Sequence, residues 1–128
     1  MRNMQTNTIR NSVRMTKALA DFGRMRIVAA LMSRGELCVC QITALLGLAT
    51  SSVSRHLSLL QNAHLIDARR DGRWIYYRLS DEFPAELERW FKNDALKTRE
   101  AQEDIEKLDS LLRRKPAEHC RRRGKNDK

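Results

Sequence analysis

The apolar pattern of this chain changes its period along the sequence, and this change restricts the fold. From residue 21 to residue 60, apolar side chains recur at helical spacing, three and four residues apart. In residues 65–79, β-branched and aromatic residues flank an Asp71-Gly72 pair, which favours a hairpin turn. Helical spacing returns after Pro84, a residue well suited to a helix start. The pattern predicts a mainly α-helical fold that contains one small β-hairpin.

The expected helices are bounded by capping and helix-breaking residues. Asp21 is placed to cap the second helix, and Gly35 and Gly47 are placed to end the second and the third. The last helix is long and carries an apolar stripe from Leu87 to Leu112. The predicted helices cover residues 13–20, 22–34, 36–46, 51–60 and 84–112.

The chain is strongly basic. Lys and Arg number 25 against 16 Asp and Glu, which gives a net charge of +9. Such a balance makes nucleic acid, or another acidic surface, the expected partner. Eight bases and two acids fall within residues 113–128, where apolar side chains are scarce. We expect this segment to be a disordered tail, which is either a solvated terminus or an arm that binds phosphates without sequence preference.

Several classes of protein are disfavoured. No apolar stretch approaches the roughly 18 residues of a membrane span, and the first residues lack the apolar segment of a secretory signal. We therefore expect a cytoplasmic protein without a membrane partner, whose three cysteines are reduced thiols. The sequence has no glycine-rich phosphate loop and no evident catalytic constellation. Neither an enzyme nor an organic cofactor is expected.

The order of the predicted elements is that of a winged helix-turn-helix. Two helices joined by a tight glycine-containing turn precede a basic hairpin. In that fold the second helix of the pair reads the major groove, where Arg55 could bind guanine with two hydrogen bonds, and the hairpin contacts phosphates or the minor groove. A packed structural role for His56 is the alternative at that position. The predicted contacts to double-stranded DNA are Thr50, Ser51, Ser52, Ser54, Arg55 and His56 on the helix, and Arg69, Arg70 and Arg73 on the hairpin.

The last helix predicts a homodimer. Its apolar stripe is too long for so small a domain, and pairing with a second copy, together with the first helix, would bury it. A dimer also holds two half-sites one helical turn of DNA apart. We expect a flexible N-terminus at residues 1–12, a DNA-binding and dimerisation domain at 13–112 and the tail at 113–128. The predicted interface residues are Leu19, Leu87, Trp90, Phe91, Ile105 and Leu108.

Three motifs resemble a known family over about residues 13–91. They are Glu36-Leu37-Cys38-Val39-Cys40, the run from Ser51 to Leu60, and the run from Asp71 to Leu79. Their order and spacing resemble the ArsR/SmtB family of metal-responsive repressors. The first motif is similar to the arsenical-resistance branch, whose members bind arsenite or antimonite and then leave the operator. The resemblance implies that Cys38 and Cys40 are ligands of the inducer.

The chain also departs from the family's patterns. Thr43 stands where the enterobacterial-type site has a further cysteine. The N-terminus lacks the cysteines of the cadmium and lead sensors, and beyond the hairpin only His119 could serve as the histidine of a zinc or cobalt site. The third ligand stays open among Cys120, water and a small thiol. A thiol redox-sensing repressor, a sensor of cadmium, lead or zinc, and a constitutive architectural DNA-binding protein remain alternatives.

The spacing of the two cysteines predicts a mechanism. If both lie in the first turn of a helix, their side chains diverge by about 200°, because each residue advances the helix by about 100°. One ion could then bridge Cys38 and Cys40 only if this turn unwound or never formed. Ligation would thereby distort the helix that positions the DNA-reading helix. For a redox sensor, a disulfide between Cys38 and Cys40 would be strained, and Cys120 would be the better partner.

Overall fold

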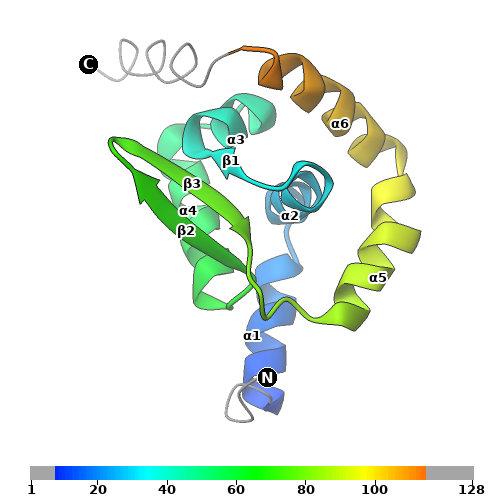
Figure 1. Cartoon of the computed structure of the whole chain (residues 1–128). Helices are drawn as coiled ribbons and strands as arrows, with labels where there is room; N and C mark the ends of the chain where they lie inside the picture. The colour runs from blue at the N-terminus through cyan, green and yellow to red at the C-terminus, as the bar shows by residue number, and fades with distance from the viewer. Residues whose placement is uncertain (1–7, 115–128) are drawn as a thin grey trace.

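The computed structural model describes residues 8–114 and consists of helices around one small sheet (Figure 1). In this range the chain forms six α-helices, one 3-10 helix and three strands. None of these helices combines the length and the apolar character that crossing a membrane would need. The mainly helical fold with a β-hairpin is confirmed. In chain order the elements are α1 (Ile9–Leu19), α2 (Phe22–Arg34), β1 (Leu37–Cys38), α3 (Val39–Leu46), α4 (Thr50–Asn62), β2 (Ile66–Asp71), β3 (Trp74–Leu79), α5 (Ala85–Asn93), η2 (Ala95–Lys97) and α6 (Arg99–Leu112).

The first helix begins earlier than the sequence predicts. The Thr8 hydroxyl accepts a hydrogen bond from the Asn11 N–H at 3.1 Å and caps α1. Residues 9–12 are therefore helical, and the boundary predicted at residue 13 moves to residue 9. Residues 1–7 lie outside the described part of the chain, as do residues 115–128 of the predicted tail.

Helix α2 lies in the middle of the fold (Figure 1). The Asp21 carboxylate accepts a hydrogen bond from the Arg24 N–H at 3.1 Å, so this residue caps α2 as predicted. Every residue from Ile27 to Leu31 is buried. A stretch that is buried on all sides has to be surrounded, and α2 contacts α1, α3, α4, α6 and β3. The other elements are thus assembled around α2.

A tight turn joins α3 to α4. Gly47 ends α3 with a φ of 67°, a left-handed conformation that favours glycine, and its N–H donates to the Thr43 carbonyl at 2.9 Å. Helix α4 then buries Val53, Leu57 and Leu60 on one side. These contacts leave the opposite face of α4 directed outwards.

The sheet has the strand order β1-β3-β2, and both pairings are antiparallel. Asp71 pairs with Trp74, so the hairpin turns through only Gly72 and Arg73. Gly72 has a φ of 63°, which is typical of such short hairpin loops. The predicted hairpin is therefore confirmed, and a third strand extends it.

Strand β1 replaces the predicted start of the third helix. The helical pattern predicts that residues 36–38 lie in that helix, whereas Leu37 and Cys38 pair with Tyr77 and Tyr76 of β3. Pairing with a neighbouring strand requires an extended backbone, so the helix starts only at Val39. The prediction of a helix from residue 36 is wrong for this reason.

The predicted long last helix is interrupted. Residues 94–98 separate α5 from α6, and α5 and α6 curve around α2 on the side away from the hairpin (Figure 1). The Thr98 hydroxyl accepts from the Ala101 N–H at 3.3 Å and donates to the Ala95 carbonyl at 2.8 Å, which fixes the new helix start. The interruption lets both Phe91 and Leu108 become completely buried inside the protomer.

We predict that Thr98→Ala lowers the free energy of unfolding by about 1 kcal/mol, as expected for the loss of an N-cap. Urea unfolding of the purified protein measures this difference. Thr98→Ser keeps the capping hydroxyl and should unfold close to the parent. Equal stability of the alanine variant and the parent would show that the break between α5 and α6 does not depend on this cap.

Candidate functional site

The outward face of α4 is polar. Ser51, Ser52, Ser54 and Arg55 are all exposed, and Thr50 is half-buried at the helix start. The face opposite to them packs into the core. The structure therefore places four of the predicted DNA contacts together on one accessible surface. Hydroxyl and guanidinium donors of this kind suit base edges and phosphates.

His56 does not belong to this exposed face. Its side chain is only 17% exposed, and its Nδ1 lies 3.2 Å from an Arg24 guanidinium nitrogen. Since a guanidinium only donates, Nδ1 accepts and the ring hydrogen lies on Nε2. Nε2 is 3.8 Å from the Asp21 carboxylate, and a Cβ at Gly23 would lie 3.1 Å from it. His56 thus packs α4 against the start of α2, which favours the structural alternative for this residue.

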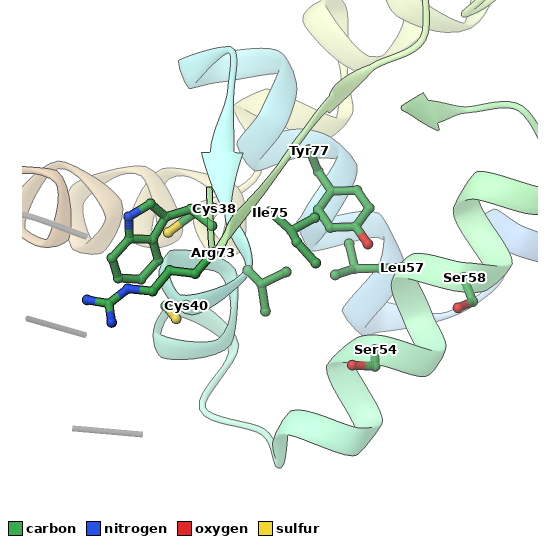
Figure 2. A pocket seen from close by; sticks show the side chains of 10 residues that line it. Cys38, Cys40, Ser54, Leu57, Ser58, Arg73, Ile75 and Tyr77 are labelled. Carbon is green, nitrogen blue, oxygen red and sulfur yellow. The ribbon is translucent and has the colours of Figure 1, made fainter. Parts of the chain in front are cut away.

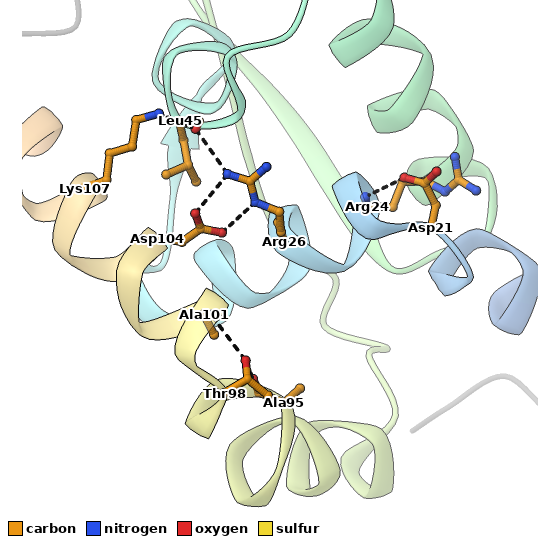
Figure 3. Close-up of polar contacts among 9 residues, drawn as sticks. All are labelled: Asp21, Arg24, Arg26, Leu45, Ala95, Thr98, Ala101, Asp104 and Lys107. Atoms are coloured by element: carbon orange, nitrogen blue, oxygen red, sulfur yellow. Dashed lines mark hydrogen bonds and ion pairs between the residues drawn. The ribbon is translucent and has the colours of Figure 1, made fainter.

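The Asp21 carboxylate connects this packing to the capping of α2 (Figure 3). The hydrogen bond from the Arg24 N–H lowers the pKa of Asp21, and the charge of Arg24 acts in the same direction against partial desolvation. The carboxylate therefore stays ionised in the folded protein to lower pH than in the unfolded chain.

The three predicted arginines of the hairpin have different surroundings. Arg70 is exposed on β2, and the Arg73 guanidinium lies 4.8 Å from the centre of the Trp74 ring. Arg69 is exposed as well, but its guanidinium donates two hydrogen bonds to the Glu36 carboxylate, both at 2.7 Å. Sequence reasoning missed Glu36, because the strand that carries it to the hairpin was not predicted.

The two candidate ligand cysteines meet in one cavity of about 700 Å³ (Figure 2). The cavity lies between the start of α3, strand β3 and helix α4. Burial raises the pKa of the Tyr77 phenol in its wall, which keeps that group neutral. The lining residues are Cys38, Val39, Cys40, Ser54, Leu57, Ser58, Arg73, Trp74, Ile75 and Tyr77.

Cys38 and Cys40 differ in solvent exposure and in redox state. Cys38 is a free thiol and only 1% exposed. Cys40 is half-buried and disulfide-bonded, so the expectation of reduced thiols holds at Cys38 and fails at Cys40. Within residues 8–114, no three His, Cys, Asp or Glu side chains form a group that could hold a metal ion. Cys120, the protein candidate for a third ligand, lies outside the described residues.

The backbone between these cysteines differs from the predicted helical turn. Cys38 is the N-cap of α3, with φ −83° and ψ 160°, and its N–H donates to the Gln41 side-chain oxygen at 3.0 Å. Cys40 is the second residue of the helix. Since only one of the two cysteines is helical, the calculated divergence of 200° does not apply, and of the two predicted alternatives the structure has the one in which the turn does not form at Cys38.

A polar cluster attaches α6 to the opposite end of α3 (Figure 3). The Arg26 guanidinium donates to both oxygens of Asp104, at 2.8 and 2.9 Å. The Leu45 carbonyl accepts from Lys107 at 2.9 Å and from Arg26 at 3.4 Å. A bidentate pair of this kind is directional, so it fixes how α6 lies across α2 and α3.

The predicted interface residues divide into two groups. Leu19, Leu87 and Ile105 are half-buried and Trp90 is exposed. Each of these four residues therefore has accessible surface that a second chain could cover. Phe91 and Leu108 have none, because both are completely buried in the core of the protomer. Direct contact of these two residues with a second chain is therefore contradicted.

The turn-linked helices α3 and α4 and the basic hairpin form a winged helix-turn-helix, a fold of DNA-binding regulators. A similar solution structure is the homodimeric winged helix-turn-helix DNA-binding domain of Mb0332 from Mycobacterium bovis, a possible ArsR-family transcriptional regulator. The two chains are 28% identical with a TM-score of 0.60, and the match covers 75% of this chain and 85% of that one.

The model of the arsR family of bacterial regulatory proteins matches residues 21–68, so this part of the chain is an ArsR-family helix-turn-helix domain. The chain is 46% identical over 68 residues to the arsenic resistance transcriptional regulator ArsR1 of Pseudomonas putida, with 53% of each chain covered. It is 42% identical over 73 residues to the arsenical resistance operon repressor of Escherichia coli, covering 57% of this chain and 62% of that one. A cadmium resistance regulatory protein CadC homolog of Staphylococcus aureus is 39% identical over 71 residues, covering 56% and 59%. The chain thus spans little more than half of each relative.

We predict that Asp21→Ala destabilises the fold at neutral pH by about 1 kcal/mol, because an N-cap is lost. The pKa of Asp21 is lowered by folding, so its stabilising effect is present above the unfolded pKa and is lost as the pH falls through the folded one. The difference from the parent should therefore shrink below about pH 4. Urea unfolding across this range tests it, with Asp21→Asn as a capping control. A difference that is independent of pH would contradict the role of the carboxylate charge.

Proposed function

We propose that this chain is a cytoplasmic, metalloid-responsive repressor that binds operator DNA as a homodimer and is released when arsenite or antimonite binds at Cys38 and Cys40. The observation that carries the proposal is the shared cavity. The two cysteines form one part of its wall, and the DNA-reading helix α4 and the hairpin form the rest. A ligand in this cavity would contact the elements that hold DNA. The names of the arsenic-resistance relatives support arsenite as the inducer.

The DNA-binding part of the proposal uses the exposed face of α4 and the hairpin. Arg55 is exposed and not needed for packing, so its guanidinium is available for the O6 and N7 atoms of a guanine. Ser51, Ser52 and Ser54 supply hydroxyl donors beside it, and Arg70 and Arg73 supply charge for phosphates.

The inducer part rests on thiolate chemistry. Trivalent arsenic is a soft centre, and thiolates are the ligands that such centres select. In the reduced protein, each ligating thiol would replace one hydroxyl of arsenite, with its proton leaving in a water molecule. Cys38 lines the cavity but is only 1% exposed, and we propose that β1 moves relative to β3 when its Sγ binds arsenic. Because β1 is two residues long, this movement involves only two residue pairs.

The movement of β1 would also disturb DNA binding. Strand β3 is shared by β1 and the hairpin, so a shift of β1 changes the support of the hairpin. DNA and arsenite would then favour different arrangements of the same sheet. The coupling has to be reciprocal, which means that operator DNA weakens arsenite binding by the same factor.

The homodimer is proposed from exposed apolar side chains near the first and last helices. Ile9 and Val13 of α1, Phe22 at the start of α2 and Trp90 of α5 are exposed in the protomer. Burying side chains of this size against a second copy would be favourable by roughly 1.5–3 kcal/mol each. The homodimeric Mb0332 domain is consistent with this assembly.

A redox-sensing repressor is the second candidate, favoured by the disulfide bond of Cys40. In this function, oxidation of Cys40 would replace arsenite as the signal for release. Cys38 is free, so we propose Cys120 as the oxidation partner. Mild oxidation without arsenite should then release DNA and give a defined Cys40–Cys120 disulfide in peptide mass spectra. Release that needs arsenite under reducing conditions supports the first candidate instead.

We predict that Arg55→Ala weakens operator binding by about 1–3 kcal/mol and relaxes the preference at one base pair, as expected for a lost bidentate contact. Mobility shifts on the DNA upstream of the chain's own gene, with single-base variants, measure both effects. Gln61→Ala, at an exposed position of α4 outside the predicted contacts, serves as a matched control. Unchanged binding by the Arg55 variant would mean that the face of α4 is not the reading surface.

We predict that Cys38→Ser and Cys40→Ser each retain operator binding and lose release by arsenite, because a hydroxyl is a poor ligand for soft arsenic. The same mobility shift, titrated with arsenite, antimonite, cadmium and zinc under reducing conditions, provides the measurement. A weakened response in Cys120→Ser would identify that cysteine as the third ligand. Release of the Cys38/Cys40 double variant at the parental arsenite concentration would place the inducer site elsewhere.

A further inference from the structure

Four side chains from three parts of the chain converge across the sheet. Cys38 of β1 pairs with Tyr76 of β3, and Tyr76 pairs with Arg69 of β2. These three residues therefore form one row across the strands, and paired residues in a row direct their side chains to the same face. Glu36 lies two residues before Cys38. Its carboxylate accepts two hydrogen bonds from the Arg69 guanidinium.

The Arg69 guanidinium has contacts along its edge and on its face. Its Nε and one terminal nitrogen each donate to a different Glu36 oxygen at 2.7 Å. The same guanidinium lies 4.8 Å from the centre of the Tyr76 ring. The Arg69 side chain is nevertheless 53% exposed and that of Glu36 is 29% exposed, so the pair is accessible from solvent.

We propose that Glu36 is a positioning residue that competes with operator phosphate for Arg69 and thereby links the cysteine-bearing strand to the hairpin. This inference rests on the proposed DNA-binding function of the hairpin. In the free protein Glu36 holds Arg69 over Tyr76. On DNA, Arg69 exchanges the carboxylate for a phosphate oxygen. The exchange is feasible because carboxylate and phosphate both accept two parallel guanidinium hydrogen bonds.

The position of Glu36 gives this competition a link to the inducer. Glu36 and Cys38 lie on one short segment, so a displacement of β1 that exposes the Cys38 thiol also moves the Glu36 carboxylate. Glu36 already holds Arg69 in the protein without DNA, so its carboxylate opposes phosphate binding by the hairpin until this pair is broken. A protein without this carboxylate should need more inducer for release.

Glu36→Gln tests the proposal, because it removes the charge and keeps the size of the side chain. The expected result is tighter binding to both operator and random-sequence duplex DNA. The slope of log affinity against log salt should steepen by about 0.9, the value for one additional phosphate contact. The arsenite concentration for half-release from the operator should rise by the same factor as the operator affinity.

Two further variants separate this effect from a general change in charge or structure. Glu86→Gln changes the net charge equally and releases Arg89 from a comparable pair on α5, away from the hairpin, so it should leave the salt slope unchanged. Arg69→Ala should weaken DNA binding, and adding Glu36→Gln to it should have no further effect. Urea unfolding of each variant shows whether the fold is intact.

The outcomes are distinct. Weaker DNA binding by Glu36→Gln, or an effect that persists in the Arg69→Ala background, would overturn the competition and leave Glu36 as a structural support of the hairpin. Normal DNA binding by Arg69→Ala, together with loss of binding in Arg55→Ala, would overturn the role of Arg69 while DNA binding stands. Failure of the parent protein to bind any duplex would remove the proposed function itself.

Discussion

The pairing of the two-residue strand β1 with β3 is the interaction on which the arrangement of the site depends. Because Leu37 and Cys38 are committed to the sheet, α3 starts at Val39, and the two cysteines lie on either side of a change from extended to helical backbone. The same pairing places Cys38 beside Tyr76 and brings Glu36 within reach of Arg69. Without it, the sulfur atoms, the cavity and the hairpin would not belong to one structural unit.

Much of the fold could be predicted because its signals are local. Asp21 caps α2, Gly47 ends α3 and Gly72 forms the hairpin turn, and each needs only a few neighbouring residues to act. Strand β1 could not be predicted in this way. Two residues are too short to show a period of two, and the partner strand lies about forty positions further along the chain. The prediction that Cys38 lies in a helix was wrong for the same reason.

The last two helices, α5 and α6, show a second feature that the apolar spacing alone does not predict. The apolar stripe predicted one continuous helix, but a stripe does not reveal whether the helix turns back on its own domain. The break before Thr98 and the pairing of Arg26 with Asp104, 78 positions apart, bring Phe91 and Leu108 into the core. Phe91 and Leu108, which were predicted to contact a second chain, therefore stabilise the core of their own protomer. Of the candidate site, the exposed face of α4 was predictable, whereas the partner of Arg69 was not.

The contact between His56 and Gly23 has a consequence for how operator preference could change. Any side chain at position 23 would meet the imidazole, so the inner side of α4 is matched to one glycine on α2. Ser51, Ser52, Ser54 and Arg55 carry no comparable constraint. If α4 reads DNA as proposed, new DNA sequences can thus be read by exchanging residues on one face of α4, whereas a side chain at position 23 would require the His56 ring to shift.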